Sequence, residues 1–143
     1  MRGGKTYNSY RDNPFFKYLT PEQREHAALV YWMRYALKQA KWHHTVNEGK
    51  RTPFERYLWD IMGGKKSIPD FLFTDPIGPY TGLALELKPT GAQIFRKDGK
   101  PLADKVDQWK CLEEFKERGW YATFASGIDE AMDIIKKYYN NEL

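Results

Sequence analysis

Apolar residues recur along this chain with two different periods. Residues 20–40 and 104–118 carry apolar side chains three and four positions apart, which is the spacing of one helix face. Residues 67–73 and 82–88 are shorter apolar runs bounded by Gly and Pro, as is typical of strands. The predicted elements, in chain order, are a helix from Thr20 to about Ala40, a strand at 42–46, a helix at 52–61, strands at 67–73 and 82–88, a helix at 104–118, a strand at 120–125 and a helix at 128–139.

Several of these boundaries carry local chemical signals. Thr20 followed by Pro21 is a helix start, with Thr as the N-cap and Pro in the first turn, and Thr52-Pro53 repeats it. Pro89 has no N–H to donate, so the strand before it should end at Lys88. The alternation of strands and helices predicts an α/β fold, with a mixed central sheet flanked by helices.

Length and composition limit the function classes. A chain of 143 residues suits one domain, predicted at 20–143, behind an aromatic N-terminal arm at 1–19, and leaves no room for a separate domain for an organic cofactor. One cysteine, Cys111, excludes an intrachain disulfide and any zinc site built on several cysteines. No apolar run is long enough for a membrane span or a signal peptide, so a cytoplasmic protein with no membrane partner is expected. The net charge of +4 is compatible with a polyanionic partner but does not require one.

Three charged residues interrupt the two apolar strands. Period-two geometry places Glu86 and Lys88 on one face of their strand, and Asp70 joins them if the two strands are neighbours. Two carboxylates suit a hard divalent cation, and a nearby ammonium can hold an attacking water or a phosphate oxygen. This set of side chains indicates metal-assisted phosphodiester hydrolysis.

An ordered series of motifs resembles a known nuclease family. Pro69-Asp70, then Glu86-Leu87-Lys88, then a helix and a strand resemble the PD-(D/E)XK nuclease superfamily. Glu25 in the first helix, Asn47-Glu48-Gly49, Gly63-Gly64 and Gln108 narrow the resemblance to its VRR-NUC branch, over residues 20–139. The resemblance implies a restriction-endonuclease-like αβββαβ core. It also implies a metal-dependent, structure-selective endonuclease, in particular a homodimeric Holliday-junction resolvase of phage or bacterial type that acts on branched or junction DNA.

The same resemblance implies roles for individual residues. Asp70 and Glu86 would bind Mg²⁺, or Mn²⁺ as a substitute, with the backbone carbonyl of Leu87 as a further ligand. Lys88 would orient or deprotonate the water or stabilise charge on the phosphate. Glu25 would reach the metal through water, and Gln108 would support the site.

Other interpretations of these residues remain open. Glu86 and Lys88 alone would also fit a solvated strand face, Glu25 a carboxylate that interacts with the helix dipole, and Gln108 an exposed helix residue. Glu48 is a competing acid, which we rank below Glu25. At the level of function, the alternatives are a monomeric flap or 5′-end nuclease and a non-catalytic DNA-binding module with the same fold.

Further motifs are weaker. The pair His43-His44 lacks the later histidine that an HNH nuclease needs, and Gly63-Gly-Lys-Lys-Ser67 lacks the glycine spacing of a Walker A loop. The N-terminal arm is a candidate for part of a dimer interface. Candidate DNA contacts, each equally compatible with plain solvated charge, are Lys65, Lys66, Arg96, Lys97 and Lys100.

Overall fold

The computed structural model describes residues 10–45 and 51–143. The chain forms two compact units, which divide between Gln39 and Ala40, and each is described here by itself. The predicted turn at 47–49, with Glu48, lies outside the described residues, as does the start of the N-terminal arm. The described part of the predicted arm therefore shares a unit with the first helix, and a domain boundary after residue 19 stays a prediction.

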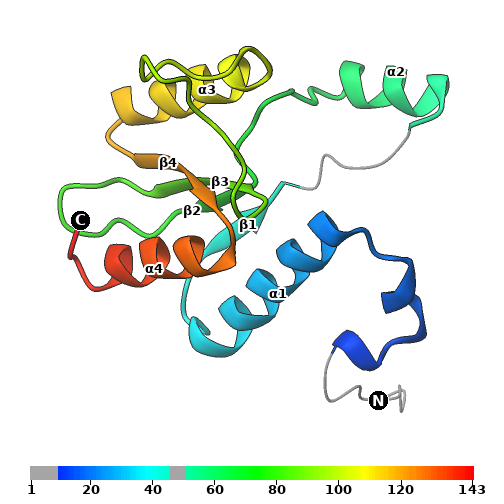
Figure 1. Cartoon of the computed structure of the whole chain (residues 1–143), viewed down its shortest axis with the longest axis horizontal. Coiled ribbons are helices and arrows are strands. Elements are labelled where there is room, and N and C mark those ends of the chain that lie inside the picture. The colour runs from blue at the N-terminus through cyan, green and yellow to red at the C-terminus, as the bar shows by residue number, and fades with distance from the viewer. Residues whose placement is uncertain (1–9, 46–50) are drawn as a thin grey trace. The chain divides into compact units, whose positions relative to one another are not determined.

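The first unit is helical. Two short 3-10 helices, η1 (Tyr10–Asp12) and η2 (Pro14–Tyr18), lead into α1 (Pro21–Ala36) (Figure 1). The predicted N-cap is confirmed, because Thr20 Oγ1 accepts a hydrogen bond from the Gln23 N–H at 3.2 Å and the Thr20 N–H donates to Gln23 Oε1 at 2.9 Å. The predicted limit of about Ala40 is wrong: Leu37 has φ −123° and ψ 50°, outside the helical region, so α1 ends at Ala36.

The second unit is built on a four-stranded mixed sheet in the order β1-β2-β3-β4. The first two neighbouring pairs are antiparallel and the third is parallel. The predicted order of helices and strands is thereby confirmed. Its elements are β1 (Trp42–His44), α2 (Pro53–Ile61), β2 (Phe71–Phe73), β3 (Leu83–Lys88), the 3-10 turn η3 (Ala103–Lys105), α3 (Val106–Glu117), β4 (Tyr121–Ser126) and α4 (Ile128–Tyr139).

Helices α3 and α4 cover opposite faces of this sheet (Figure 1). On one face, Ala84 of β3 and Phe124 of β4 pack with Leu112 of α3. Since side chains alternate along a strand, the buried Leu83 and Leu85 lie on the other face, toward α4. Glu86 and Lys88 are in phase with Ala84, so the two charged residues of β3 point to the face that α3 covers.

The strand predicted at 67–73 is shorter than expected. Ser67 has φ 65°, in the left-handed region that an extended strand cannot contain, and β2 begins only at Phe71. Asp70 therefore lies directly before the strand rather than inside it. No helix in the described part of the chain combines the length and the apolar character needed to cross a bilayer.

Candidate active site

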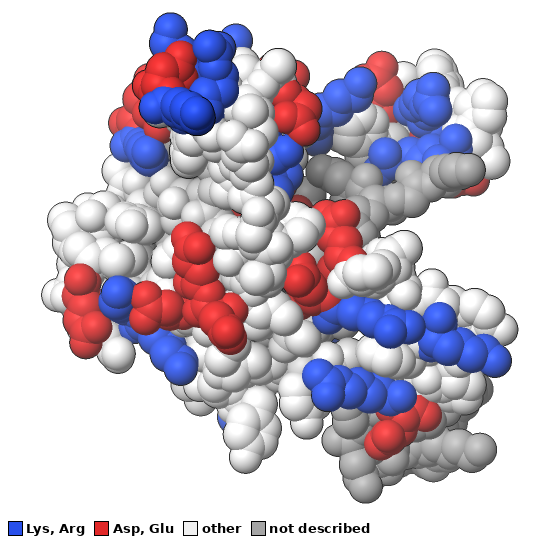
Figure 2. Space-filling model, viewed as in Figure 1, with Lys and Arg blue, Asp and Glu red and all other residues white. Residues whose placement is uncertain are grey.

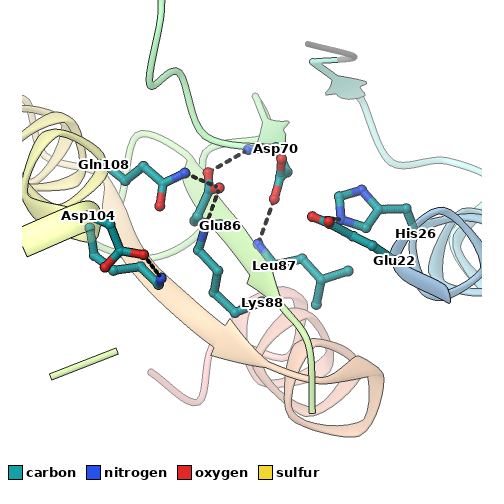
Figure 3. Close-up of polar contacts among 9 residues, drawn as sticks. Glu22, His26, Asp70, Glu86, Leu87, Lys88, Asp104 and Gln108 are labelled. Atoms are coloured by element: carbon teal, nitrogen blue, oxygen red, sulfur yellow. Dashed lines mark hydrogen bonds and ion pairs between the residues drawn. The ribbon is translucent and has the colours of Figure 1, made fainter. Parts of the chain in front are cut away.

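The site lies at the end of β2 and β3 where the two strands stop pairing through their backbones. Phe71 pairs with Leu85, so Asp70 comes opposite Glu86. There, the Asp70 N–H donates to Glu86 Oε2 at 3.2 Å, and the Leu87 N–H donates to Asp70 Oδ2 at 2.8 Å (Figure 3). Carboxylates thus satisfy backbone donors at this edge, and the same bonds bring the two acids together.

Glu86 is the centre of the site. Its side chain is buried, with the residue only 5% exposed, on the face that α3 covers. Gln108, in the first turn of α3, donates from Nε2 to Glu86 Oε1 at 3.1 Å, and Lys88 Nζ lies 3.5 Å from the same oxygen (Figure 3). Three segments of the second unit therefore converge on one carboxylate.

The charges of the site do not balance. Burial first, and then the neighbouring Asp70 carboxylate, raise the pKa of Glu86 from its ordinary 4.5 to about 8, although Lys88 and the Asp70 N–H lower it. One ammonium faces two carboxylates, and it does not offset both desolvation and like-charge repulsion. The arrangement favours the uptake of further positive charge, either a proton or a cation.

The donor atoms suit a hard divalent cation. Asp70 and Glu86 supply carboxylate oxygens, the ligands that Mg²⁺ takes one or two of while it keeps several waters. Gln108 Oε1 is buried and has no hydrogen-bond partner in the described part of the chain, so a further oxygen faces this polar region. Over residues 10–45 and 51–143, no group of three His, Cys, Asp or Glu side chains is placed to hold a metal. Any cation bound by these two carboxylates would need other ligands, such as water, to complete its coordination.

A second charged pair lies beside the site and was not singled out from the sequence. Lys105 Nζ lies 2.8 Å from Asp104 Oδ2, on the 3-10 turn that leads into α3 (Figure 3). The hydrogen bond from Lys105 holds the pKa of Asp104 below its ordinary value, and the charge of Lys88 adds a smaller effect in the same direction. An acid next to a base before a helix is common in sequences, so only the fold shows that this pair is close to Lys88.

The other predicted site residues are on different elements of the chain. Glu25 is on α1, in the first unit, and its link to the metal stays a prediction. Lys65 and Lys66 are exposed and line a groove of about 330 Å³ with Asp107 and Lys110 of α3. Since that groove also holds acids, its affinity for DNA stays a prediction.

The basic loop after β3 is exposed at all three of its predicted DNA contacts, Arg96, Lys97 and Lys100, and Arg96 pairs with Asp98 at 3.3 Å. The histidines of β1 have separate surroundings. The ring of His44 stacks on that of Phe71, with centroids 4.3 Å apart, whereas His43 is exposed. His44 therefore packs against a buried core residue, whereas His43 faces solvent.

The whole chain can be compared with known proteins. A solved structure of a "VRR_NUC domain protein" superimposes with a TM-score of 0.59 at 22% sequence identity, covering 81% of this chain and 88% of that one. No protein-family model and no curated protein match the sequence. At this identity the likeness concerns the fold, whose mixed sheet flanked by helices was expected from the sequence. The chain therefore has the restriction-endonuclease-like α/β fold of a VRR_NUC domain protein.

Proposed function

We propose that this chain is a metal-dependent endonuclease that hydrolyses phosphodiester bonds in branched DNA, most specifically a Holliday-junction resolvase. One observation carries the proposal. Asp70, Glu86, Lys88 and Gln108 converge at one end of β3, on a fold shared with a VRR_NUC domain protein. Neither feature alone would carry it, since folds host many functions and a carboxylate pair can be structural.

In this proposal Asp70 and Glu86 hold Mg²⁺, or Mn²⁺ in its place. The Leu87 carbonyl is a further ligand, and Glu25 acts through water. When bound, the cation supplies Lewis-acid polarisation of the phosphate and lowers the pKa of a bound water. Its charge also suits the site, because burial, and then the Asp70 carboxylate, raise the pKa of Glu86 to about 8, and a bound cation would stabilise the ionised form of both acids.

Lys88 acts on the carboxylate and on the substrate, and Gln108 acts on the carboxylate. The Lys88 side chain is only 15% exposed, so its ammonium is restrained near Glu86 while it retains donors for a water or a phosphate oxygen. Gln108 holds the orientation of Glu86 from α3. Gln108 would thereby keep Glu86 in position, and Lys88 would stabilise charge that develops on the phosphate.

The substrate preference follows from what the chain can contact. The candidate contacts Lys65, Lys66, Arg96, Lys97 and Lys100 are suited to phosphates, and phosphate contacts select shape and position rather than base sequence. Symmetric incision of a four-way junction also needs two active sites related by a two-fold axis, so a homodimer is part of the proposal.

A substrate panel tests the proposal directly. The purified full chain is incubated with a four-way junction, a flap and a plain duplex, each with Mg²⁺ or with EDTA. We expect paired symmetric nicks in the junction with Mg²⁺ only. A single cut near the flap would instead support the monomeric flap or 5′-end nuclease. Binding without cleavage in either Mg²⁺ or Mn²⁺ would overturn the proposal in favour of a non-catalytic module.

The variant Lys88→Ala separates chemistry from binding. Removal of the ammonium should lower the rate of cleavage of bound junction by roughly 100- to 1,000-fold, because charge at the phosphate loses its donor. Junction affinity, measured by mobility shift, should change little. Lys116→Ala, which removes an exposed lysine at the far end of α3, is the control and should cleave like the wild type. Equal rates for the two variants would contradict the role of Lys88.

A further inference from the structure

Helix α2 carries an apolar face that the rest of the second unit leaves exposed. Its members recur at positions i, i+3, i+4, i+7 and i+8, so they lie on one side of the helix. None of the residues of α2 is buried. The face consists of Phe54 (68% exposed), Tyr57 (61%), Leu58 (39%), Ile61 (59%) and, at the C-cap, Met62 (77%).

The helix itself is well formed. Thr52 Oγ1 accepts a hydrogen bond from the Glu55 N–H at 3.2 Å, and the Met62 N–H donates to the Leu58 carbonyl at 3.0 Å. Gly63 ends the helix with φ 89°, as the left-handed C-terminal stop of a helix requires. Figure 1 shows α2 standing away from the sheet of its unit. The exposed face therefore belongs to a stable element and not to a frayed segment.

The opposite flank of α2 is held by local packing. Trp59 lies under the guanidinium of Arg51, 4.7 Å from the ring centroid, and against Gly64. A Cβ on Gly64 would lie 2.2 Å from the Trp59 ring, so this close approach requires glycine. In Figure 2 the surface over α2 is partly charged and partly uncharged, as expected of a helix with an apolar face on one side and charged residues on the other. The helix thus turns its apolar side outward.

The size of this face suits a protein interface. Five large apolar side chains exposed to these fractions present roughly 600 Å², which is at or above the largest apolar patch of a typical monomer, about 300–600 Å². Two such faces in contact would bury roughly 1,200 Å², the lower limit for a specific, stable interface. One such face on each chain therefore supplies enough apolar area for a stable dimer.

Its chemistry selects the kind of partner. The face has no cation to contact phosphate, so DNA is a poor occupant. The charged residues of α2, Glu55, Arg56 and Asp60, lie off the apolar positions and sum to only −1, so they add little repulsion between two copies of the helix. In an antiparallel pair centred on Leu58, Phe54 of one copy meets Met62 of the other. The face is therefore complementary to itself.

We propose that two copies of this chain associate through the apolar faces of α2, around a two-fold axis near Leu58. The inference deepens the proposed function, because symmetric incision needs two active sites in a fixed relation. Residues 62–69 connect α2 to Asp70, so an interface on α2 would adjoin the segment that leads to one proposed metal ligand in each copy. Dimerisation itself depends only on the exposed face and can be measured without DNA.

The mass of the full chain in solution tests the interface. Sedimentation equilibrium should give twice the chain mass at micromolar concentration. The double variant Leu58→Glu and Ile61→Glu should raise the dimer dissociation constant by at least about 100-fold, with unchanged helical circular dichroism, because Glu favours a helix. Arg56→Glu changes the charge equally, on the opposite side of α2, and should remain a dimer. A wild type at the chain mass, or a double variant at twice that mass, overturns the proposal.

Disulfide crosslinking tests the position of the axis with a single substitution in the face. In a Cys111→Ser background, Leu58→Cys should form a covalent dimer on mild oxidation, because its two copies lie near the axis. Arg56→Cys is the matched control and should not. Equal crosslinking of the two variants overturns the predicted geometry. So does a chain that becomes monomeric when residues 1–19 are deleted but not when the α2 face is changed, since that result assigns the interface to the arm.

Failure of this inference is distinguishable from failure of the proposed function. A dimer through α2 that cleaves no DNA leaves the interface standing and removes the nuclease. A wild-type monomer that cleaves DNA removes the interface and leaves the nuclease standing. If the interface and the nuclease are both confirmed, the double variant should still nick single strands of a junction with Mg²⁺ but lose paired incision.

Discussion

The two ends of β2 each carry an aspartate, and the two acids have different surroundings. Asp70 precedes the strand and accepts the Leu87 N–H at 2.8 Å, while Asp75 follows the strand and accepts the Lys41 N–H, also at 2.8 Å. In both cases a carboxylate binds a backbone donor of another segment. This shared bond does not distinguish a structural acid from a candidate catalytic one.

The other partners make the difference. Asp75 Oδ2 also accepts the hydroxyl of Tyr139 at 2.7 Å, and the Asp75 carbonyl accepts that of Tyr138 at 2.5 Å. Burial, and then the bond to Asp75, raise the pKa of Tyr139, so this hydroxyl stays a neutral donor. Asp70 instead faces Glu86, whose pKa rises to about 8. One end of β2 joins segments through neutral donors, and the other concentrates negative charge that a cation can offset.

Among the variants at the two ends of β2, Glu86→Gln is expected to have the largest effect on cleavage. This variant keeps an acceptor oxygen but removes the charge, so cleavage should fall by roughly 1,000-fold. In EDTA the variant should be more stable than the wild type. The folded pKa of about 8 exceeds the ordinary 4.5, so the stability that the wild type gains from protonated Glu86 is full below pH 4.5 and lost as the pH rises through 8. Thermal unfolding at pH 9 should show a rise in Tm on the order of 5 °C.

The control for this prediction is pH itself. The difference in Tm between Glu86→Gln and the wild type should shrink as the pH falls toward 5, because Glu86 is then protonated and its buried side chain carries no charge. Added Mg²⁺ should raise the Tm of the wild type but not of the variant. A variant that is less stable than the wild type at every pH would mean that Glu86 is structural, like Asp75.

Much of the fold could be predicted from local patterns. The order of helices and strands was correct, and α4 was predicted with its observed bounds, Ile128–Tyr139. Strand β3 illustrates why. Its side chains alternate at period two, so the common face of Glu86 and Lys88 follows from the backbone alone and needs no tertiary information.

What local patterns could not show depends on contacts between distant residues. Gln108 was expected at the site only through the family resemblance, since its approach to Glu86 requires the packing of α3 on β3, and the bond between Asp75 and Tyr139 spans 64 positions. In the sequence, Asp75-Pro76 is ordinary loop chemistry. The exposure of α2 was also not foreseen, because an amphipathic pattern is the same whether the apolar face meets its own chain or another molecule.

The next largest effect concerns the structural end of β2. Asp75→Ala leaves the Lys41 N–H and the Tyr139 hydroxyl without this acceptor, which should lower the free energy of unfolding by about 2 kcal/mol. Urea denaturation measures the change. Cleavage per folded molecule should stay at the wild-type rate, because the site is at the other end of the strand. Asp98→Ala, in the exposed loop, should change stability by less than about 0.5 kcal/mol. A large loss of cleavage in folded Asp75→Ala would contradict the purely structural role of Asp75.

The smallest effect is expected at Gln108, which acts on the site only through Glu86. Gln108→Ala removes a donor to the ionised carboxylate, so Glu86 should bind Mg²⁺ more weakly and cleavage should fall by about tenfold. Two measurements identify a positioning role. The Mg²⁺ concentration for half-maximal rate should rise, with partial rescue at high Mg²⁺, and the pH midpoint of cleavage should move upward because the charged form of Glu86 has lost a hydrogen bond. Glu117→Ala, an exposed truncation at the far end of α3, should change neither. A tenfold loss without either shift would mean that Gln108 contacts the substrate itself, and the carboxylate pair would then be oriented by the backbone bonds of β2 and β3 alone.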